Sequence, residues 1–346
     1  MRGNLGLGKE KGVVYDIQRF SVNNGTGIRT TVYLKGCTIR CKWCHNPEGI
    51  RHYPEVFHYW PKCTNCGKCD DACPANAMEV IDKIEWGGEE RELDLPEVEK
   101  RILEAEGVKL SYAIKKRVSR KIRIKKDKCI GCFRCVQACP EEAFVVVGRF
   151  MTVDEVMEEV LADKIFYEKS GGGMSVSGGE PTAQPEFTLS LLKRAKENGI
   201  HTALDTNGNL EWDFFKELLK YTDLVLYDIK SMEPEAHKDF TGVDNKRILE
   251  NIKRIATETD VTIRLRFPVI PNINDNKENV EKTAQLAKSL GIEWVDILPY
   301  HGFAGQKYRL FSLDFPFPIG EDYPEEKVEE IRKIFESFGL QTTIGG

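Results

Sequence analysis

The apolar residues of this chain follow two alternating spacings over most of its length. Short runs rich in β-branched and aromatic residues predict strands at 31–34, 174–177, 201–205, 224–229, 261–269 and 294–298. Apolar residues at helical spacing predict helices at 184–198, 211–220, 245–257, 275–290 and 325–338. Strands and helices that take turns are typical of parallel βα units with right-handed crossovers. We therefore predict an α/β fold, a partial (β/α)6 TIM-like barrel.

One more helix is predicted directly after residue 150. Thr152 and Glu155 have the spacing of a capping box, which marks the helix start. Helical periodicity then continues to the glycines at 171–173, which end the helix.

The barrel pattern is interrupted between about residue 54 and residue 148. We therefore predict two domains, a barrel core made of residues 1–53 and 149–346 and an α+β insert at 54–148. Within the insert, residues 97–106 are predicted to form a helix.

Composition narrows the class of protein. The 346 residues are 41% hydrophobic and 30% charged, and no apolar run approaches the length of a membrane span. The N-terminal sequence lacks the apolar stretch of an export signal, so we expect a cytoplasmic protein. A net charge of -5 argues against a general nucleic-acid binder.

The eleven cysteines form three groups with none left over. Dense spacing in a long cytoplasmic chain indicates metal ligation rather than disulfides. The groups are Cys37, Cys41 and Cys44; Cys63, Cys66, Cys69 and Cys73; and Cys129, Cys132, Cys135 and Cys139.

The second and third groups repeat one pattern, C-x2-C-x2-C-x3-C-P, which is the bacterial ferredoxin run that holds [4Fe-4S] clusters. Three cysteines of a run bind one cluster, and the fourth binds the other cluster. We assign Cys63, Cys66 and Cys69 with Cys139 to one cluster, and Cys129, Cys132 and Cys135 with Cys73 to the other. A pair of zinc sites is the alternative, although zinc ribbons use separated C-x2-C pairs.

The first group supplies only three thiolates, at C-x3-C-x2-C spacing. No fourth cysteine remains for it, so a cubane bound there keeps one iron open, as catalytic metal sites do. A zinc site with His45 as fourth ligand is the alternative.

With Trp43 before its last cysteine, this loop resembles the radical S-adenosylmethionine (SAM) superfamily. The resemblance implies that the open iron chelates the amino and carboxylate groups of SAM. It also implies that Trp43, Cys44 and His45 border the adenine through the main chain.

Residues at the ends of the predicted strands extend the resemblance to one family. They are Gly178-Gly179-Glu180, Asp205 with its Thr-Asn-Gly turn, Asp228-Ile229-Lys230, Arg266 and His301. Such ends meet at the active-site face of a barrel. As a series they resemble the glycyl radical enzyme activating enzymes, of which pyruvate formate-lyase activating enzyme is one.

That family resemblance implies a role for most of these residues. Gly178, Gly179 and Glu180 would hold the methionyl amino group, and Arg266 the carboxylate. Asp228 and Lys230 would reach the carboxylate or the ribose, and His301 the ribose or adenine. Asp205 and Ile229 are assigned to the same SAM site.

The implied cofactors are three [4Fe-4S] clusters and SAM. One electron cleaves SAM to methionine and a 5′-deoxyadenosyl radical, which takes hydrogen from a backbone glycine of a partner glycyl radical enzyme. Two alternatives stay open: a radical SAM enzyme that acts on a small molecule or another peptide, and an iron–sulfur electron-transfer protein.

The insert also contains a basic segment. Residues 111–128 include nine Lys or Arg and one Asp. A solvated face is the ordinary interpretation of such a run, and a docking patch for a flavodoxin or ferredoxin electron donor is the sharper one. We expect the chain to act as a monomer.

Overall fold

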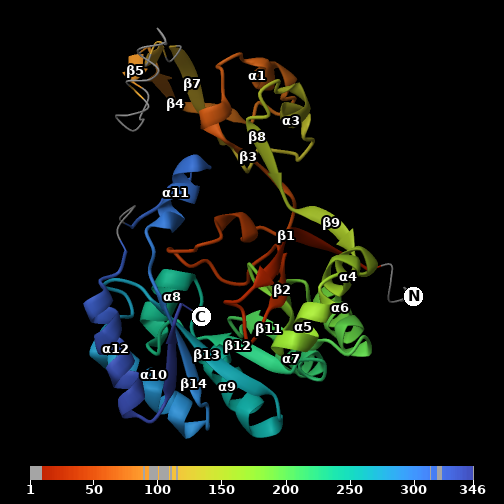
Figure 1. Ribbon diagram of the computed structural model, residues 1–346, viewed down its shortest axis with the longest axis vertical. Helices are drawn as coiled ribbons and strands as arrows, with labels where there is room; N and C mark the ends of the chain where they lie inside the picture. Colours follow the sequence, from red (N-terminus) through yellow and green to blue (C-terminus); the bar gives the residue numbers. More distant parts are fainter. Residues whose placement is uncertain are drawn as a thin grey trace. The chain divides into compact units, whose positions relative to one another are not determined.

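The alternating strands and helices fold around one nine-stranded sheet in the computed structural model (Figure 1). The structure describes residues 10–88, 90–92, 100, 109, 111–113, 116–311, 313–317 and 322–345. The chain forms two compact units, Met1–Glu55 with Val147–Tyr308 and Phe315–Gly346, and Val56–Val146 with Arg309–Asp314. Except for residue 100, the helix predicted at 97–106 lies outside the described residues.

Seven strands of the larger unit run parallel. In spatial order they are β15 (Gln341–Ile344), β14 (Trp294–Pro299), β13 (Thr262–Val269), β12 (Leu224–Asp228), β11 (His201–Thr206), β10 (Gly173–Gly178) and β2 (Arg29–Leu34). Beyond β2 the sheet continues with β1 (Lys11–Ser21), which pairs antiparallel with β2, and β9 (Arg149–Thr152), which pairs antiparallel with β1. All six predicted strands are present, while β1, β9 and β15 were not predicted. The two end strands, β15 and β9, do not pair with each other in this sheet, so the barrel is open.

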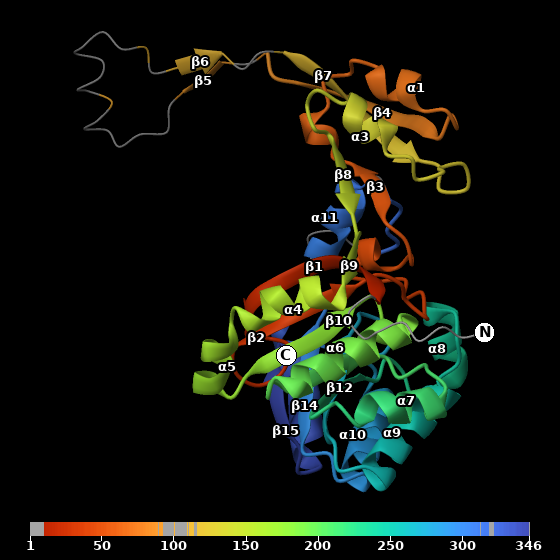
Figure 2. The ribbon, with the colours of Figure 1, turned by 90° about the vertical axis from the view of Figure 1, so that its right-hand side faces the viewer.

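Helices cover one face of this sheet (Figure 2). They are α4 (Val153–Leu161), α5 (Lys164–Ser170), α6 (Pro185–Glu197), α7 (Trp212–Leu219), α8 (Pro234–Thr241), α9 (Lys246–Glu258), α10 (Lys277–Ser289) and α12 (Glu325–Ser337). A further helix, α11 (Phe303–Leu310), follows β14 and is not part of this layer (Figure 2). Along β13, Leu265 and Phe267 are buried in the main core, whereas Arg264 and Arg266 alternate with them and are only partly buried. Because successive side chains of a strand point to opposite faces, the second face of the sheet carries polar groups.

The helix predicted after residue 150 is two helices. Its capping box is confirmed, because Thr152 Oγ1 accepts from the Glu155 N–H and the Glu155 carboxylate accepts from the Thr152 N–H. The prediction of one continuous helix is wrong, since α4 ends at Leu161 and α5 begins at Lys164. At the break, Asp163 accepts hydrogen bonds from Thr30 Oγ1 at 2.8 Å and Arg19 Nε at 2.9 Å. Burying this carboxylate against its partners interrupts the helix.

The smaller unit repeats one short motif around its eight cysteines. Its strands pair as β3 (Glu55–His58) with β8 (Phe144–Val147), β4 (Met78–Trp86) with β7 (Arg117–Ile124), and β5 (Glu90–Glu92) with β6 (Ser111–Ala113). Each ferredoxin run contains a five-residue helix, α1 (Lys68–Ala72) or α3 (Arg134–Ala138). Each helix follows a residue with left-handed backbone, Gly67 at φ 80° and Phe133 at φ 56°. The sequence repeat is therefore also a structural repeat.

Three short 3-10 helices complete the described elements: η1 (Pro47–Gly49), η2 (Trp60–Lys62) and η3 (Pro181–Ala183). Within the described residues, no helix combines the length and the apolar character that a membrane crossing requires.

Candidate functional site

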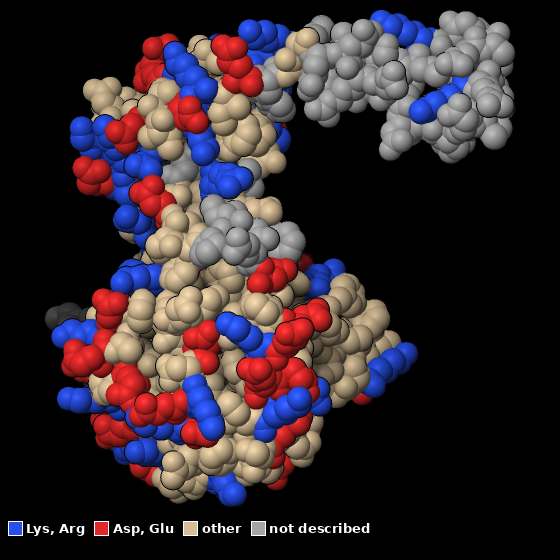
Figure 3. Space-filling model, turned by 90° about the vertical axis from the view of Figure 1, so that its left-hand side faces the viewer, with Lys and Arg blue, Asp and Glu red and all other residues tan. Residues whose placement is uncertain are grey.

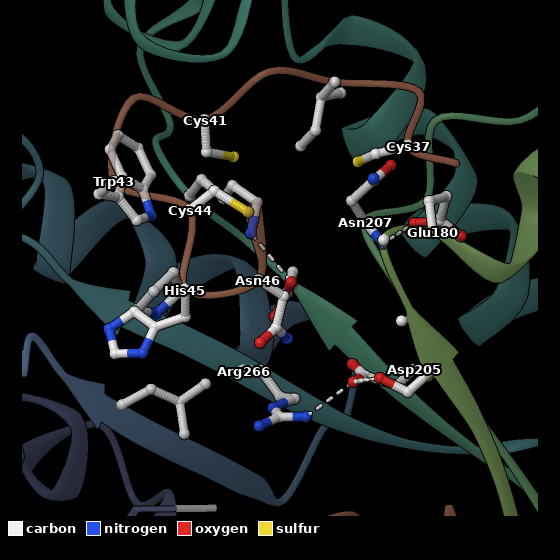
Figure 4. Close-up of a pocket in the computed structure, with 18 of the residues that line it drawn as sticks. Cys37, Cys41, Trp43, Cys44, His45, Asn46, Glu180, Asp205, Asn207 and Arg266 are labelled. Carbon is white, nitrogen blue, oxygen red and sulfur yellow. Dashed lines mark hydrogen bonds and ion pairs between the residues drawn. The ribbon is translucent and has the colours of Figure 1, made fainter. Parts of the chain in front are cut away.

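A cavity of about 410 Å³ lies at the carboxyl ends of the parallel strands (Figure 4). Thirteen of the residues predicted for the SAM site and its cluster line it: Cys37, Cys41, Trp43, Cys44, His45, Gly178, Gly179, Glu180, Asp205, Asp228, Lys230, Arg266 and His301. Ile229 does not line the cavity and is buried in the hydrophobic core. It alternates with Asp228 and Lys230, so its side chain faces the other way.

The three-cysteine loop directs its sulfur atoms into this cavity, as Figure 4 shows for Cys37, Cys41 and Cys44. Main-chain hydrogen bonds fix the loop on two sides. The Arg40 N–H donates to the Thr241 carbonyl at 2.7 Å, at the end of α8, and the Cys37 N–H donates to the Ile50 carbonyl at 3.0 Å. The unpredicted helix α8 is thus one support of the cysteine loop.

Two lysines hold the chain that follows the loop. Lys35 is fully buried, and its Nζ donates to the Glu48 carbonyl at 2.6 Å and to Glu55 Oε2 at 3.1 Å. Lys307 Nζ donates to Glu48 Oε1 at 2.7 Å and to Asn46 Oδ1 at 3.1 Å. These contacts fix the residues after Cys44 from both sides.

The donor chemistry of the loop fits an iron–sulfur cube. Burial raises the pKa of the Cys37 and Cys44 thiols to about 12, so a metal must supply the positive charge that keeps them ionised at neutral pH. Throughout the described part of the chain, no group of three or more His, Cys, Asp or Glu side chains is arranged to hold a single metal ion. Thiolates that bind different irons of one cube lie farther apart than those that share one ion. Thiolates are the ligands of iron–sulfur clusters, so the donor set of the loop fits such a cube.

Glu180 is a buried carboxylate at the wall of the cavity. Its Oε1 accepts from Thr206 Oγ1 at 2.7 Å and from the Thr182 N–H at 3.1 Å, and its Oε2 accepts from the Asn207 N–H at 2.7 Å. Burial raises its pKa to about 7, although these hydrogen bonds oppose the shift. A ligand ammonium group at this wall would favour the ionised carboxylate.

Two further charge pairs line the cavity. Arg266 Nη1 donates to Asp205 Oδ2 at 3.0 Å, and Ser177 Oγ donates to the same oxygen at 2.7 Å. Lys230 Nζ lies 2.9 Å from Asp228 Oδ2. Burial alone would lower the pKa of Lys230, but Asp228 and the nearby Cys41 thiol raise it above its usual value. Both cations therefore stay charged.

The aromatic and imidazole groups occupy other parts of the lining. Burial lowers the pKa of His45, so its ring is neutral at pH 7. His301 is half exposed, and its Nδ1 lies 3.4 Å from Asp322 Oδ1.

Several polar residues to which the sequence analysis gave no role also line the cavity, among them Asn46, Ser177, Thr206 and Asn207. Ser177, Thr206 and Asn207 hold the carboxylates in place. In the sequence these three residues are marked only by their positions close to Glu180 and Asp205. Their hydrogen bonds connect different strands, and the sequence does not show such contacts.

Glycines let two backbone segments meet behind the cavity. Gly178 has φ 131°, and a Cβ on it would lie 2.2 Å from the Leu34 carbonyl oxygen. A Cβ on Gly179 would lie 2.3 Å from the Gly36 oxygen and 2.4 Å from the Gly49 oxygen. Only glycine allows this approach.

The smaller unit has two further cavities, each lined by four cysteines. The first cavity contains Cys63, Cys66, Cys69 and Cys139, and the second contains Cys73, Cys129, Cys132 and Cys135. These are the same two sets of four that the sequence assigns to two clusters. In each set the fourth cysteine of a run accepts a backbone hydrogen bond, from Ala143 to Cys139 and from Ala77 to Cys73, both at 3.3 Å.

The basic segment forms ion pairs. Lys116 pairs with Glu85, Arg120 with Asp70, Arg123 with Asp314 and Lys125 with Glu79. Figure 3 shows blue and red side chains interspersed on the visible face of this unit. The segment is therefore partly neutralised by its own neighbours.

The chain matches two known families. It matches the Radical SAM superfamily over residues 127–300, a range that contains β10 to β14, and the 4Fe-4S dicluster domain over residues 56–140. The iron–sulfur character that the cysteine spacing predicts for the insert, and the barrel family, are confirmed.

Proteins of similar length match the chain almost from end to end. The isethionate sulfite-lyase activating enzyme of Oleidesulfovibrio alaskensis is 38% identical over 92% of this chain and 93% of its own. The (2S)-3-sulfopropanediol dehydratase activating enzyme of Klebsiella oxytoca is 34% identical over 96% of this chain and 97% of its own. The trans-4-hydroxy-L-proline dehydratase activating enzyme of Clostridioides difficile is 34% identical over 96% of this chain and 99% of its own.

Proposed function

Because this chain belongs to the radical SAM superfamily and, within it, to the activating enzymes of glycyl radical enzymes, we propose that SAM is cleaved in the cavity at the carboxyl ends of its strands. One observation carries this proposal: the three cysteines without a fourth line the same cavity as buried acids and bases. The chain activates its partner by cleaving SAM to methionine and a 5′-deoxyadenosyl radical. That radical takes a hydrogen atom from a backbone glycine and leaves as 5′-deoxyadenosine.

The residues of the cavity bind and orient SAM. When bound to Cys37, Cys41 and Cys44, the cluster supplies one electron and an open iron. Glu180 accepts from the SAM ammonium group, and Arg266 and Lys230 attract the carboxylate. Trp43 and His45 border the adenine, and His301 the ribose. Gly178 and Gly179 have no side chains, so the cavity wall behind SAM consists of main chain at these two positions.

The eight remaining cysteines bind two further clusters, which makes three in all. Clusters held by these cysteines would supply electrons for the cluster at which SAM binds, and a flavodoxin or ferredoxin would be the electron donor. We place the protein in the cytoplasm, because a reducing compartment keeps its thiols free to bind iron. We also propose that it acts as a monomer.

Replacing Cys37 with Ala tests the proposal. Anaerobic wild-type protein is expected to contain about twelve irons, four in each of three cubes. The Cys37→Ala protein is expected to lose about four of them, together with all 5′-deoxyadenosine formation under dithionite. The Cys129→Ala protein should still bind SAM and be reduced more slowly. Normal 5′-deoxyadenosine release by Cys37→Ala would contradict the proposal.

The partner is tested separately. Isethionate sulfite-lyase is the probe, because a relative at 38% identity is named as its activating enzyme. Mixing it with reduced protein and SAM should produce the doublet electron paramagnetic resonance signal of a glycyl radical. Release of 5′-deoxyadenosine without that doublet would contradict this partner while leaving SAM cleavage intact.

A further inference from the structure

The first and second cavities of the smaller unit are built from the same sequence run but have different linings. Their backbones match closely, since Asn65 and Gly131 are both left-handed, as are Asn76 and Glu142. Those positions correspond within the two runs. A difference between the two sites must therefore come from the side chains around the cysteines.

A buried cation lines the first cavity. Arg120, on β7, is 8% exposed, and its Nη2 donates to Cys69 Sγ at 3.4 Å. Its Nη1 pairs with Asp70, but the Asp70 side chain is 40% exposed whereas that of Arg120 is 9% exposed. The Asp70 carboxylate opposes this cation at Cys69, whereas the guanidinium is shielded from solvent and also donates a hydrogen bond to the sulfur. Glu141 also lines this cavity and is exposed, so solvent screens its charge.

A buried imidazole lines the same cavity. His58 is 1% exposed, and its Nδ1 accepts from the Ile122 N–H at 3.2 Å. An accepting Nδ1 carries no proton, so the neutral ring carries its proton on Nε2. That Nε2 is buried and has no hydrogen-bond partner among the described residues. The ring can therefore donate one hydrogen bond to a group bound in the cavity.

The second cavity has no such groups. Apart from its four cysteines, its described lining is wholly apolar: Val56, Ala75, Ala77, Met78, Ile130 and Phe133. In the second run, Val136 stands where the first run has Asp70, beside the third cysteine. A cluster in the second cavity therefore meets thiolates, backbone and hydrocarbon only.

Reduction adds a negative charge to a cluster, so a nearby cation and a hydrogen bond to a sulfur stabilise its reduced state. We propose that Arg120, assisted by His58, raises the reduction potential of the cluster in the first cavity above that of its twin, so that an electron entering this unit settles in the first cavity. In that step one electron leaves the second-cavity cluster and enters the first-cavity cluster, with no proton moved and no bond broken. A low-potential one-electron donor of the flavodoxin or ferredoxin class supplies the electron. The inference rests on the proposed function in one respect, namely that the eight cysteines bind two clusters.

A redox titration of the full chain carrying Cys37→Ala tests the inference. This background retains the clusters of the smaller unit, and dithionite with mediators is the reductant. Two one-electron waves are expected by electron paramagnetic resonance. Adding Arg120→Gln should decrease the equilibrium constant for reduction of the first-cavity cluster at least tenfold. That change lowers the upper midpoint potential by about 59 mV for one electron, and the lower midpoint potential should not change.

Three further variants separate charge from folding. Arg120→Lys should restore most of the upper midpoint, because it keeps the charge. His58→Phe should lower the same midpoint by less, because it removes one neutral donor. Lys121→Gln removes an equal charge from the next residue of β7, which alternates with Arg120 and does not line the cavity. It should move neither midpoint.

The possible failures are distinguishable. Fewer than about eight irons per chain in the Cys37→Ala background would contradict the two-cluster part of the proposed function, and the inference with it. Eight irons with an upper midpoint that Arg120→Gln does not move, or moves together with the lower one, would overturn the inference alone. An equal shift caused by Lys121→Gln would also overturn it.

Discussion

The two ends of the barrel sheet each contain a buried arginine, and the two arginines differ in how many of their nitrogens find acceptors in the protein. At the amino end, Arg29 is fully buried, and all three of its nitrogens donate, among others to Ser175 Oγ at 2.7 Å and the Met174 carbonyl at 2.8 Å. At the carboxyl end, Arg266 donates to Asp205, but its buried Nε finds no acceptor among the described residues. The first arginine is satisfied by the protein itself, whereas the second faces a cavity.

The difference separates stability from function within one sheet. Burial lowers the pKa of Arg29 to about 10, so it remains charged at neutral pH, in a network that only protein atoms complete. The charged groups at the carboxyl end leave hydrogen-bonding capacity for a ligand. We therefore expect substitutions at the amino end to change unfolding, and substitutions at the carboxyl end to change SAM binding.

The largest effect is expected for Arg29→Met. The substitution leaves Ser175 Oγ and the carbonyls of Thr26 and Met174 without their buried donor. It should lower the free energy of unfolding by about 3 kcal/mol or more, measured by urea denaturation. Arg29→Lys should lose less. If Arg29→Met kept its stability but lost SAM binding, the amino end of the sheet would serve ligand binding, and our assignment of the two ends would be wrong.

Glu180→Gln is expected to have the next largest effect, on binding. It removes the carboxylate that we assign to the SAM ammonium group, and should weaken SAM binding about a hundredfold, or about 2.7 kcal/mol. Calorimetry on the anaerobic, iron-loaded protein measures this change. The free energy of unfolding should fall by only about 1 kcal/mol, for the hydrogen bond from the Asn207 N–H. Glu186→Gln, at an exposed position at the start of α6, is the control. Equal SAM affinities for Glu180→Gln and this control would show that Glu180 does not bind SAM.

The smallest effect is expected for Asp163→Asn, and it depends on pH. The hydrogen bond from Arg19 holds the pKa of Asp163 below its usual value, against the effect of burial and with help from Thr30. A carboxyl group whose pKa is depressed by folding stabilises the protein above its unfolded pKa, about 3.9, and this contribution is lost as pH falls. At pH 7 the variant should be less stable by about 1–2 kcal/mol.

This difference should shrink as the pH falls from about 5 to about 3, measured by urea denaturation at each pH. Glu168→Gln removes an exposed carboxylate from α5 and serves as the control. A gap between wild type and Asp163→Asn that stays constant down to pH 3 would show that the Arg19 contact does not stabilise the ionised form.

Much of the barrel could be predicted from the chain alone, because its strands are short apolar runs and its helices begin and end at ordinary signals. The elements that escaped prediction have weak signals. Strand β15 has four residues, three of them polar, and α8 is a short polar helix that begins at Pro234. Both are stabilised by neighbours distant in sequence. Pairing with β14 fixes β15, and the end of α8 contacts the cysteine loop.

The candidate site was predictable wherever residue type alone implies chemistry, as for the cysteines and Glu180. It was not predictable where the role depends on geometry. Ile229 was assigned to the cavity because Asp228 and Lys230 flank it. Side chains alternate in direction along this segment, so that of Ile229 points into the hydrophobic core. Asn207 was seen only as part of a turn, because it acts through its backbone N–H, which every non-proline residue possesses. Arg120 was counted only within a basic run, and its burial against Cys69 is visible only in the fold.

The wall of bare backbone at Gly178 and Gly179 has a consequence for how this enzyme can evolve. A methyl group added at either position would collide with main chain of another segment, at Leu34 for Gly178 and at Gly36 and Gly49 for Gly179. Divergence toward new partners therefore has little freedom on this side of the nucleotide. We expect libraries that randomise these glycines to yield few folded clones, while libraries that vary the lining around His301 yield many.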